Sequence, residues 1–116
     1  MQVTRLAQAP GYEAPGHHGM LGLRLQGFDV SDTQSFWVGL SHFLPGGGAE
    51  REATPVEKVY VVLDGEMIVI IGGTETVLNK FDSATIPPGE VREIVNRQNG
   101  VCTMLVVIPY PPGVKP

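Results

Sequence analysis

The sequence has little of several features that define common classes of protein. It contains a single cysteine, Cys102, so no disulfide can form within the chain. No run of about eighteen apolar residues occurs, so we expect neither a membrane-spanning helix nor a membrane partner. The first residues also lack the apolar core of about seven or more residues that a secretion signal carries, which predicts a cytoplasmic protein.

Basic residues are scarce and scattered along the chain. Eight lysines and arginines stand against twelve aspartates and glutamates, which gives a net charge of −4 at pH 7. Proteins that bind a phosphate backbone gather their cations into runs or stripes, and this sequence has none. We therefore expect no nucleic-acid partner.

Glycine and proline, in contrast, are abundant, with 15 and 10 residues among 116. They interrupt almost every stretch that is long enough for a helix, while valine, isoleucine and threonine are frequent. The length fits one domain, and a hydrophobic share of 42% excludes general disorder. The composition predicts a single all-β domain.

Short apolar stretches separated by turn signals place about eight strands along the chain. In the first, Leu21, Leu23 and Leu25 alternate, which is typical of a half-buried strand. The second is expected to end at Pro45, with the glycines 46–48 forming a turn, and Asp64-Gly65 is a strong hairpin signal. The expected strands cover residues 20–28, 35–44, 56–63, 66–71, 74–78, 83–86, 91–95 and 101–108. This spacing is typical of a sandwich or barrel over residues 19–109, with an extended arm at 1–18 and a proline-rich tail at 110–116.

Two gapless residue patterns carry a more specific resemblance. They are Gly46-x5-Glu52-x-Thr54-x3-Lys58-x6-Gly65 and Phe81-x5-Pro87-x-Gly89-x2-Arg92-x3-Asn96. Their spacing resembles the two motifs of the cupins, small proteins built as a double-stranded β-helix or jelly-roll barrel. The glycines and the Pro-x-Gly turn match, and Phe81 replaces the leading glycine of the second motif. The resemblance covers about residues 20–108 and implies the cupin fold for nearly the whole chain.

The departures from the motifs concern the metal. In metal-binding cupins four motif positions hold three histidines and a glutamate, which together bind one divalent ion. Here those positions hold Glu52, Thr54, Lys58 and Arg92. Ammonium and guanidinium groups only donate hydrogen bonds, and they repel a dication. We therefore expect a metal-free barrel with no cofactor.

If these side chains point inward as their family counterparts do, the barrel holds two cations, Lys58 and Arg92, against one acid, Glu52. Such an excess of positive charge suits a small organic anion. Arg92 would clamp it, Lys58 would supply a charge or act as a base or nucleophile, and Glu52 would be the general acid or base. The alternative is that the three residues form a structural salt-bridge network, or turn outward at the rim.

Further candidates surround this cluster. Tyr60 shares a strand face with Lys58 and either donates its phenol to the cavity or belongs to the core. Thr54 is a candidate ligand contact with a more structural character. His42 is either a core histidine or a catalytic proton shuttle. His17 and His18 are expected at the lip of the barrel, and because they are neighbours on an extended chain at most one enters it.

The function expected from these features is the binding of a small anionic molecule in the barrel by a metal-independent enzyme of isomerase, lyase or cyclase type. A non-catalytic ligand-binding or sensor protein with the same pocket is the alternative. A third hypothesis is a metal cupin with displaced ligands, namely His42, Glu52 and one of His17 or His18. The strand edges also predict a homodimer.

Overall fold

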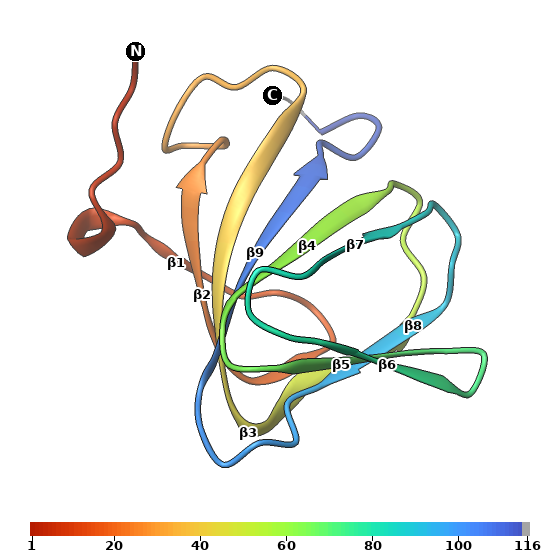
Figure 1. Cartoon of the computed structure of the whole chain (residues 1–116). Helices are drawn as coiled ribbons and strands as arrows, with labels where there is room; N and C mark the ends of the chain where they lie inside the picture. The colour runs from red at the N-terminus through yellow and green to blue at the C-terminus, as the bar shows by residue number, and fades with distance from the viewer. Residues whose placement is uncertain (115–116) are drawn as a thin grey trace.

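Alternating side chains and frequent glycine or proline breaks produce short strands throughout the chain. The computed structural model describes residues 1–114 (Figure 1). Its elements are η1 (Leu6–Gln8), β1 (Gly11–Tyr12), β2 (His17–Gln26), β3 (Phe36–Glu52), β4 (Lys58–Asp64), β5 (Met67–Ile71), β6 (Thr74–Leu78), β7 (Ser83–Ile86), β8 (Arg92–Val95) and β9 (Cys102–Pro109). None of the helical segments described is long and apolar enough to cross a membrane.

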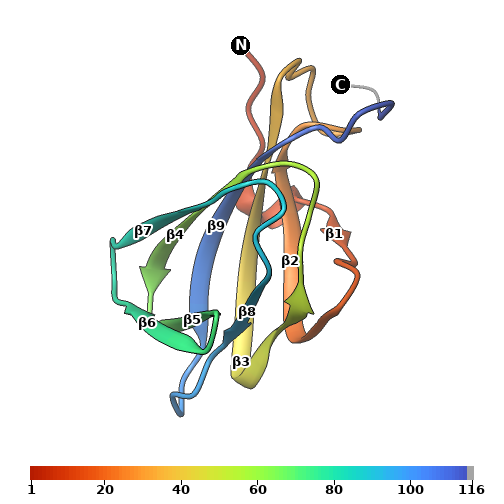
Figure 2. The same cartoon turned by 90° about the vertical axis from the view of Figure 1, so that its right-hand side faces the viewer.

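The strands pair in the order β6-β5-β8-β3-β9-β4-β7, with β2 added to β3 and β1 added to β2. All of these pairs are antiparallel. Figures 1 and 2 show the strands wrapping around a common interior, with β1 at the edge beside β2. The all-β jelly-roll barrel predicted from the two motifs is confirmed.

The longest strand, β3, corrects one expectation. It does not end at Pro45 but continues through the glycines to Glu52. A side chain on Gly47 would bring its Cβ to 2.2 Å from the carbonyl oxygen of Gly19, and one on Gly48 to 2.0 Å from that of Ile94. The glycines therefore let β3 pass closely between β2 and β8, where it exchanges β9 for β8 as its partner. Close backbone approach, and not a turn, explains why glycine stands there.

A second correction concerns the turn at Asp64-Gly65. The chain does turn there, and Gly65 has a φ of +78°, but β4 pairs with β7 and β9 while β5 pairs with β6 and β8. The turn is thus a corner between two sides of the barrel and not a hairpin. The hairpin of this region joins β5 to β6 through Gly72 and Gly73, whose φ angles are +59° and +77°.

The first part of the chain is part of the barrel wall. Within residues 1–18, expected as an extended arm, β1 pairs with β2, and β2 itself begins at His17. The leucines of β2 alternate as predicted, but Leu21 is 54% exposed while Gly22 is buried. The face of β2 turned to the interior is therefore the one that carries Gly22, not the one that carries the leucines.

The hydrophobic core lies inside the barrel. It is a cluster of buried side chains from all the strands between β3 and β9, which includes Phe43, Val62, Met67, Ile94, Cys102 and Met104. Asn96 is fully buried beside it and donates hydrogen bonds from Nδ2 to the carbonyl oxygens of Phe43 and Gly100, at 3.1 and 2.8 Å. Asn96 thus ties β3 to the segment before β9, which is a scaffold role.

Candidate functional site

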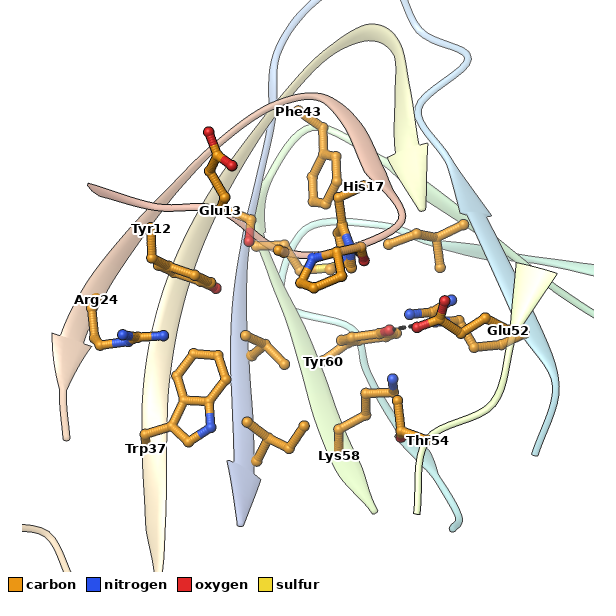
Figure 3. A pocket seen from close by; sticks show the side chains of 18 residues that line it. Tyr12, Glu13, His17, Arg24, Trp37, Phe43, Glu52, Thr54, Lys58 and Tyr60 are labelled. Atoms are coloured by element: carbon orange, nitrogen blue, oxygen red, sulfur yellow. Dashed lines mark hydrogen bonds between the residues drawn. The ribbon is translucent and has the colours of Figure 1, made fainter. Parts of the chain in front are cut away.

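The interior of the barrel contains a cavity with a volume of about 320 Å³. Its wall is formed by inward-facing residues of β2, β3, β4, β8 and β9 and is completed by residues 12–17 of the arm (Figure 3). The eighteen lining residues include five residues of the predicted site, namely Glu52, Thr54, Lys58, Tyr60 and Arg92. The motif spacing thus predicted a set of residues that the fold brings together.

Arg92 and Lys58 are the buried charges of this cavity, with 2% and 4% of their surfaces exposed. Nε of Arg92 donates a hydrogen bond to Oη of Tyr60 at 2.9 Å, and its Nη1 donates to the carbonyl oxygen of Glu50 at 2.8 Å. These bonds hold the guanidinium in one orientation. Burial, reinforced by the positive charge of Arg92, lowers the pKa of Lys58 to about 8. Lys58 is therefore a cation that can lose its proton close to neutral pH.

Glu52 lies at the rim and is exposed, although its side chain lines the same cavity. It is paired in register with Arg92 across β3 and β8. Even so, neither cation forms an ion pair with it. The ion pair that residues 1–114 do contain joins Arg97 to Glu75 at 2.7 Å, away from the cavity. The structural salt-bridge network considered for these three residues is not formed.

Tyr60 and Thr54 line the cavity beside the charges. Tyr60 is 3% exposed, and burial raises the pKa of its phenol against the opposing effect of Arg92. Its oxygen accepts the hydrogen bond from Arg92, so its own O–H remains free to donate elsewhere. The hydroxyl of Thr54 donates to the carbonyl oxygen of Val56 at 2.9 Å, which is the structural character expected of it.

The histidines separate into one inside the cavity and two outside. His17 lines the cavity and its ring stacks on Phe43 with centroids 6.4 Å apart, whereas His18 does not line it. Nδ1 of His17 lies 2.9 Å from the carbonyl oxygen of Pro15, which can only accept, so Nδ1 carries the proton and Nε2 is free. Burial, together with the nearby cations, lowers the pKa of His17 below 6.5. The ring is thus a neutral base on the arm side.

The structure corrects the expectation that His42 reaches the cluster. On β3 the neighbouring Ser41 and Phe43 line the cavity, and strand alternation turns His42 to the outer side. There its Nδ1 lies 3.0 Å from the hydroxyl of Thr103 on β9. A proton shuttle at His42 cannot contact a ligand in this cavity.

The positions of the histidines also decide whether the displaced metal site can form. In the part of the chain that the structure describes, no three His, Cys, Asp or Glu residues come close enough to hold a metal ion. His42 and Glu52 belong to different sides of the barrel wall, so the set of His42, Glu52 and His17 or His18 is not brought together. The residues in the cavity do not fit the ligand set of a divalent metal, because its buried charges are cationic.

The aromatic end of the cavity was not predicted from the sequence. Tyr12, Trp37 and Arg24 lie together on the wall across from Lys58 and Tyr60 (Figure 3), and Glu13 lines the cavity from the exposed arm. The rings of Tyr12 and Trp37 meet edge to face with centroids 5.4 Å apart. A usable signal was present, because Trp37 precedes Gly39, Ser41 and Phe43 at alternate positions of one strand.

These residues make a cavity that is cationic inside and acidic at its mouth. An anionic group can be held at the buried end by Lys58 and Arg92, while Glu52 and His17 offer proton acceptors and Tyr60 offers a donor. The aromatic wall offers flat apolar surface for the remainder of a ligand. Positioned acid and base groups beside fixed cations are the elements of acid–base catalysis.

Comparison with known proteins agrees with this architecture. Residues 39–108 match the family described as Cupin domain. A Mycobacterium tuberculosis protein named Beta-D-galactosidase Rv1717 is 49% identical over 111 residues, which cover 96% of each chain.

Among solved structures, the polyketide cyclase RemF from Streptomyces resistomycificus superposes with a TM-score of 0.85 at 21% identity, over 99% of this chain and 84% of that one. A sugar phosphate isomerase of the cupin superfamily from Silicibacter pomeroyi has a TM-score of 0.79 at 24% identity, over 93% and 75% of the two chains. At this identity the likeness to both structures shows the fold alone.

Proposed function

Because this chain belongs to the cupin family and its barrel encloses a charged cavity, we propose that it is an enzyme acting on a small organic anion by metal-independent acid–base chemistry. The observation that carries the proposal is the pair of buried cations. Lys58 and Arg92 are 4% and 2% exposed, and within residues 1–114 neither has an ion-pair partner. Buried charges without a partner are costly, so their presence in a cavity favours an anionic ligand as the missing partner.

The proposed chemistry assigns a role to each group. The anionic group of the substrate lies against the ammonium of Lys58 and the guanidinium of Arg92. The carboxylate of Glu52 accepts a proton from a carbon beside a substrate carbonyl, and the negative charge moves to the carbonyl oxygen, where Tyr60 donates a hydrogen bond. Return of the proton to another atom completes an isomerisation, and loss of a leaving group completes an elimination. The neutral Nε2 of His17 is a second acceptor on the arm side.

A second candidate function is the hydrolysis of β-D-galactosides, and the relative that is 49% identical favours it by its name. The cavity contains the two carboxylates that such a reaction generally needs, on Glu13 and Glu52. One would protonate the leaving oxygen, and the other would attack the sugar carbon or activate water. Trp37 and Tyr12 offer aromatic surface against which the sugar ring can stack.

One set of variants tests both functions. The wild type is incubated with a nitrophenyl β-D-galactoside and, separately, with oxo acids and sugar phosphates in D₂O, where exchange of carbon-bound protons is followed by NMR. Glu52→Gln should lower the active reaction by about 10²-fold to 10⁴-fold, the usual contribution of a general acid or base. Glu57→Gln is the matched control, because Glu57 is exposed and does not line the cavity.

The outcomes separate the alternatives. Galactoside hydrolysis that needs both Glu13 and Glu52 supports the second candidate and contradicts the first. Proton exchange that needs Glu52 supports the first. Anion binding that needs Arg92, with no turnover of either kind and no effect of Glu52→Gln, supports the non-catalytic ligand-binding protein. Full activity of protein that contains a stoichiometric divalent metal, lost on chelation, contradicts the metal-independent mechanism.

We also propose that the protein forms a homodimer through the outer face of β3, β9 and β4. The residues of these strands that alternate with the cavity-lining ones include the apolar Val38, Leu40, Val59, Val61, Leu105 and Val107, with His42 and Thr103 beyond them on the same side. A self-complementary apolar strip fits a second copy related by a two-fold axis. The exposed Leu21 of β2 extends the strip.

A further inference from the structure

Arg24 lies on the wall of the cavity opposite Lys58 and Tyr60 (Figure 3). It projects from β2, and its guanidinium lies among three aromatic rings, an arrangement that suits the flat, weakly hydrated arginine head group. The distances from its Cζ to the ring centroids are 4.0 Å for Phe28, 4.5 Å for Tyr12 and 5.0 Å for Trp37.

One nitrogen of this guanidinium is left without a partner by the protein. Nε of Arg24 is buried and has no hydrogen-bond partner, and no ion pair within residues 1–114 involves Arg24. Arg92, on the other side of the same cavity, donates two hydrogen bonds to protein oxygens. Buried donors are nearly always satisfied in folded proteins, so an unsatisfied arginine that lines a cavity needs an explanation.

The backbone is shaped to keep the aromatic rings around Arg24. A Cβ on Gly22 would lie 3.0 Å from the ring of Tyr12, and one on Gly39 would lie 2.6 Å from its Oη. Gly39 is also the register partner of Arg24 across β2 and β3. Any side chain at either glycine would displace Tyr12 from the guanidinium. The position of Arg24 is therefore built by two strands and the arm together.

We propose that Arg24 is a second recognition point for the ligand, and that the cavity takes a small molecule with two separated acidic groups. Lys58 and Arg92 hold one group, as in the proposed function on which this inference rests, and the terminal nitrogens of Arg24 hold the other. The middle of the molecule lies against Trp37. Glu13 and Glu52 are exposed at the mouth, so the interior is cationic at both ends. A volume of about 320 Å³ is adequate for a short dicarboxylate.

Calorimetric titration with matched acids tests this proposal. The probes are malonate, succinate and glutarate, each compared with the monocarboxylate of the same chain length. In the wild type at least one diacid should bind about tenfold or more tightly than its monoacid, the gain expected from an additional charge-assisted contact. Arg24→Gln should remove that advantage and leave the affinity for the monoacid unchanged. Arg51→Gln is the control, because Arg51 is exposed and does not line the cavity.

A second variant, Arg24→Lys, keeps the positive charge and should retain part of the preference for the diacid; it replaces Arg24→Gln if that variant does not fold. Equal effects of Arg24→Gln on the diacid and the monoacid, or no effect on either, would overturn the proposal and leave Arg24 as a packing residue. Monoacid binding that depends on Arg92 with no diacid advantage contradicts this inference alone. If neither acid binds the wild type, both this inference and anion binding at Lys58 and Arg92 are wrong.

Discussion

The inner and outer faces of β3, β9 and β4 are both largely apolar, but the inner face also carries a buried charge. The inner face packs Phe43, Val62 and Met104 into the core and also presents Lys58 to the cavity, while the outer face presents residues such as Leu105 and Val61. A monomer that bound nothing would gain by placing its apolar residues inside and its charges outside. Lys58 is the buried charge for which a ligand is proposed, and the apolar outer face is the surface for which a second copy is proposed.

The largest expected effect is on the outer face. Leu105 lies between Leu40 and Val61 at the centre of the apolar strip. Leu105→Lys should raise the Kd of the homodimer by about a hundredfold or more, because an unpaired charge enters an apolar contact. Light scattering at micromolar concentration would then report a mass near 12.5 kDa in place of twice that value.

Val77→Lys is the matched control for this prediction. Val77 is 46% exposed on β6, outside the proposed interface, and should leave the dimer intact. A wild type that is already monomeric at this concentration would show that the outer face is covered by something other than a second copy.

The next effect is on the inner face. Arg92→Ala should lower the free energy of unfolding by about 2–4 kcal/mol, because it leaves the Tyr60 hydroxyl and the Glu50 carbonyl without their donor and opens a hole in a buried site. It should also abolish the rise in Tm that millimolar phosphate or small carboxylates produce in the wild type. Urea denaturation and thermal unfolding with and without anion measure both effects. An unchanged rise in Tm with anion would contradict the proposed anion site at Arg92.

A smaller effect with a defined pH dependence is expected for Lys58. Its pKa falls from 10.5 in the unfolded chain to about 8 in the folded protein, so between these values the unfolded chain binds more protons. Burial of Lys58 therefore lowers the free energy of unfolding, and the whole of this effect is present below pH 8. The free energy of unfolding increases as the pH rises from 8 toward 10.5. Lys58→Met should be neutral or up to about 3 kcal/mol more stable at pH 7, an advantage that is lost near pH 10.

Anion binding should follow the opposite pH dependence. Protonated Lys58 attracts the ligand, so the rise in Tm caused by phosphate should decrease as the pH rises through about 8 in the wild type. In Lys58→Met the response should be weak at all pH values. Thermal unfolding at pH 7 and pH 9 in both proteins checks this. A rise in Tm in Lys58→Met as large as in the wild type would show that Lys58 does not contribute to the anion site.

The smallest effect is expected at His42, which shares β3 with the cavity but faces the other way. His42→Gln should leave anion binding unchanged and alter the free energy of unfolding by less than about 1 kcal/mol, because only the contact with Thr103 changes. Titration calorimetry and urea denaturation measure these values. A loss of anion binding would show that a substitution on the outer face alters the cavity.

Features that depend on residues close together in the sequence could be predicted, whereas features that depend on pairing between distant strands could not. The spacing of glycines and of Pro87-x-Gly89 identified the barrel, and alternation along a strand placed Lys58 and Tyr60 on one face. The same alternation was read the wrong way round for β2 and His42, because a strand's own pattern states which residues share a face but not which face is inside. Barrel closure decides that through pairing with distant strands.

The sequence by itself determined the all-β barrel, the replacement of the metal-binding histidines and the excess of cations at the motif positions, because these depend on residue identity at short, regular spacing. Only the tertiary structure decided that Lys58 and Arg92 have no ion-pair partner among residues 1–114, that His17 enters the cavity, and that Arg24 lies among the rings of Tyr12, Phe28 and Trp37. These groups come from the arm, β2 and the segment after it, β3, β4 and β8, and they meet because antiparallel pairing brings together residues that are far apart in the chain.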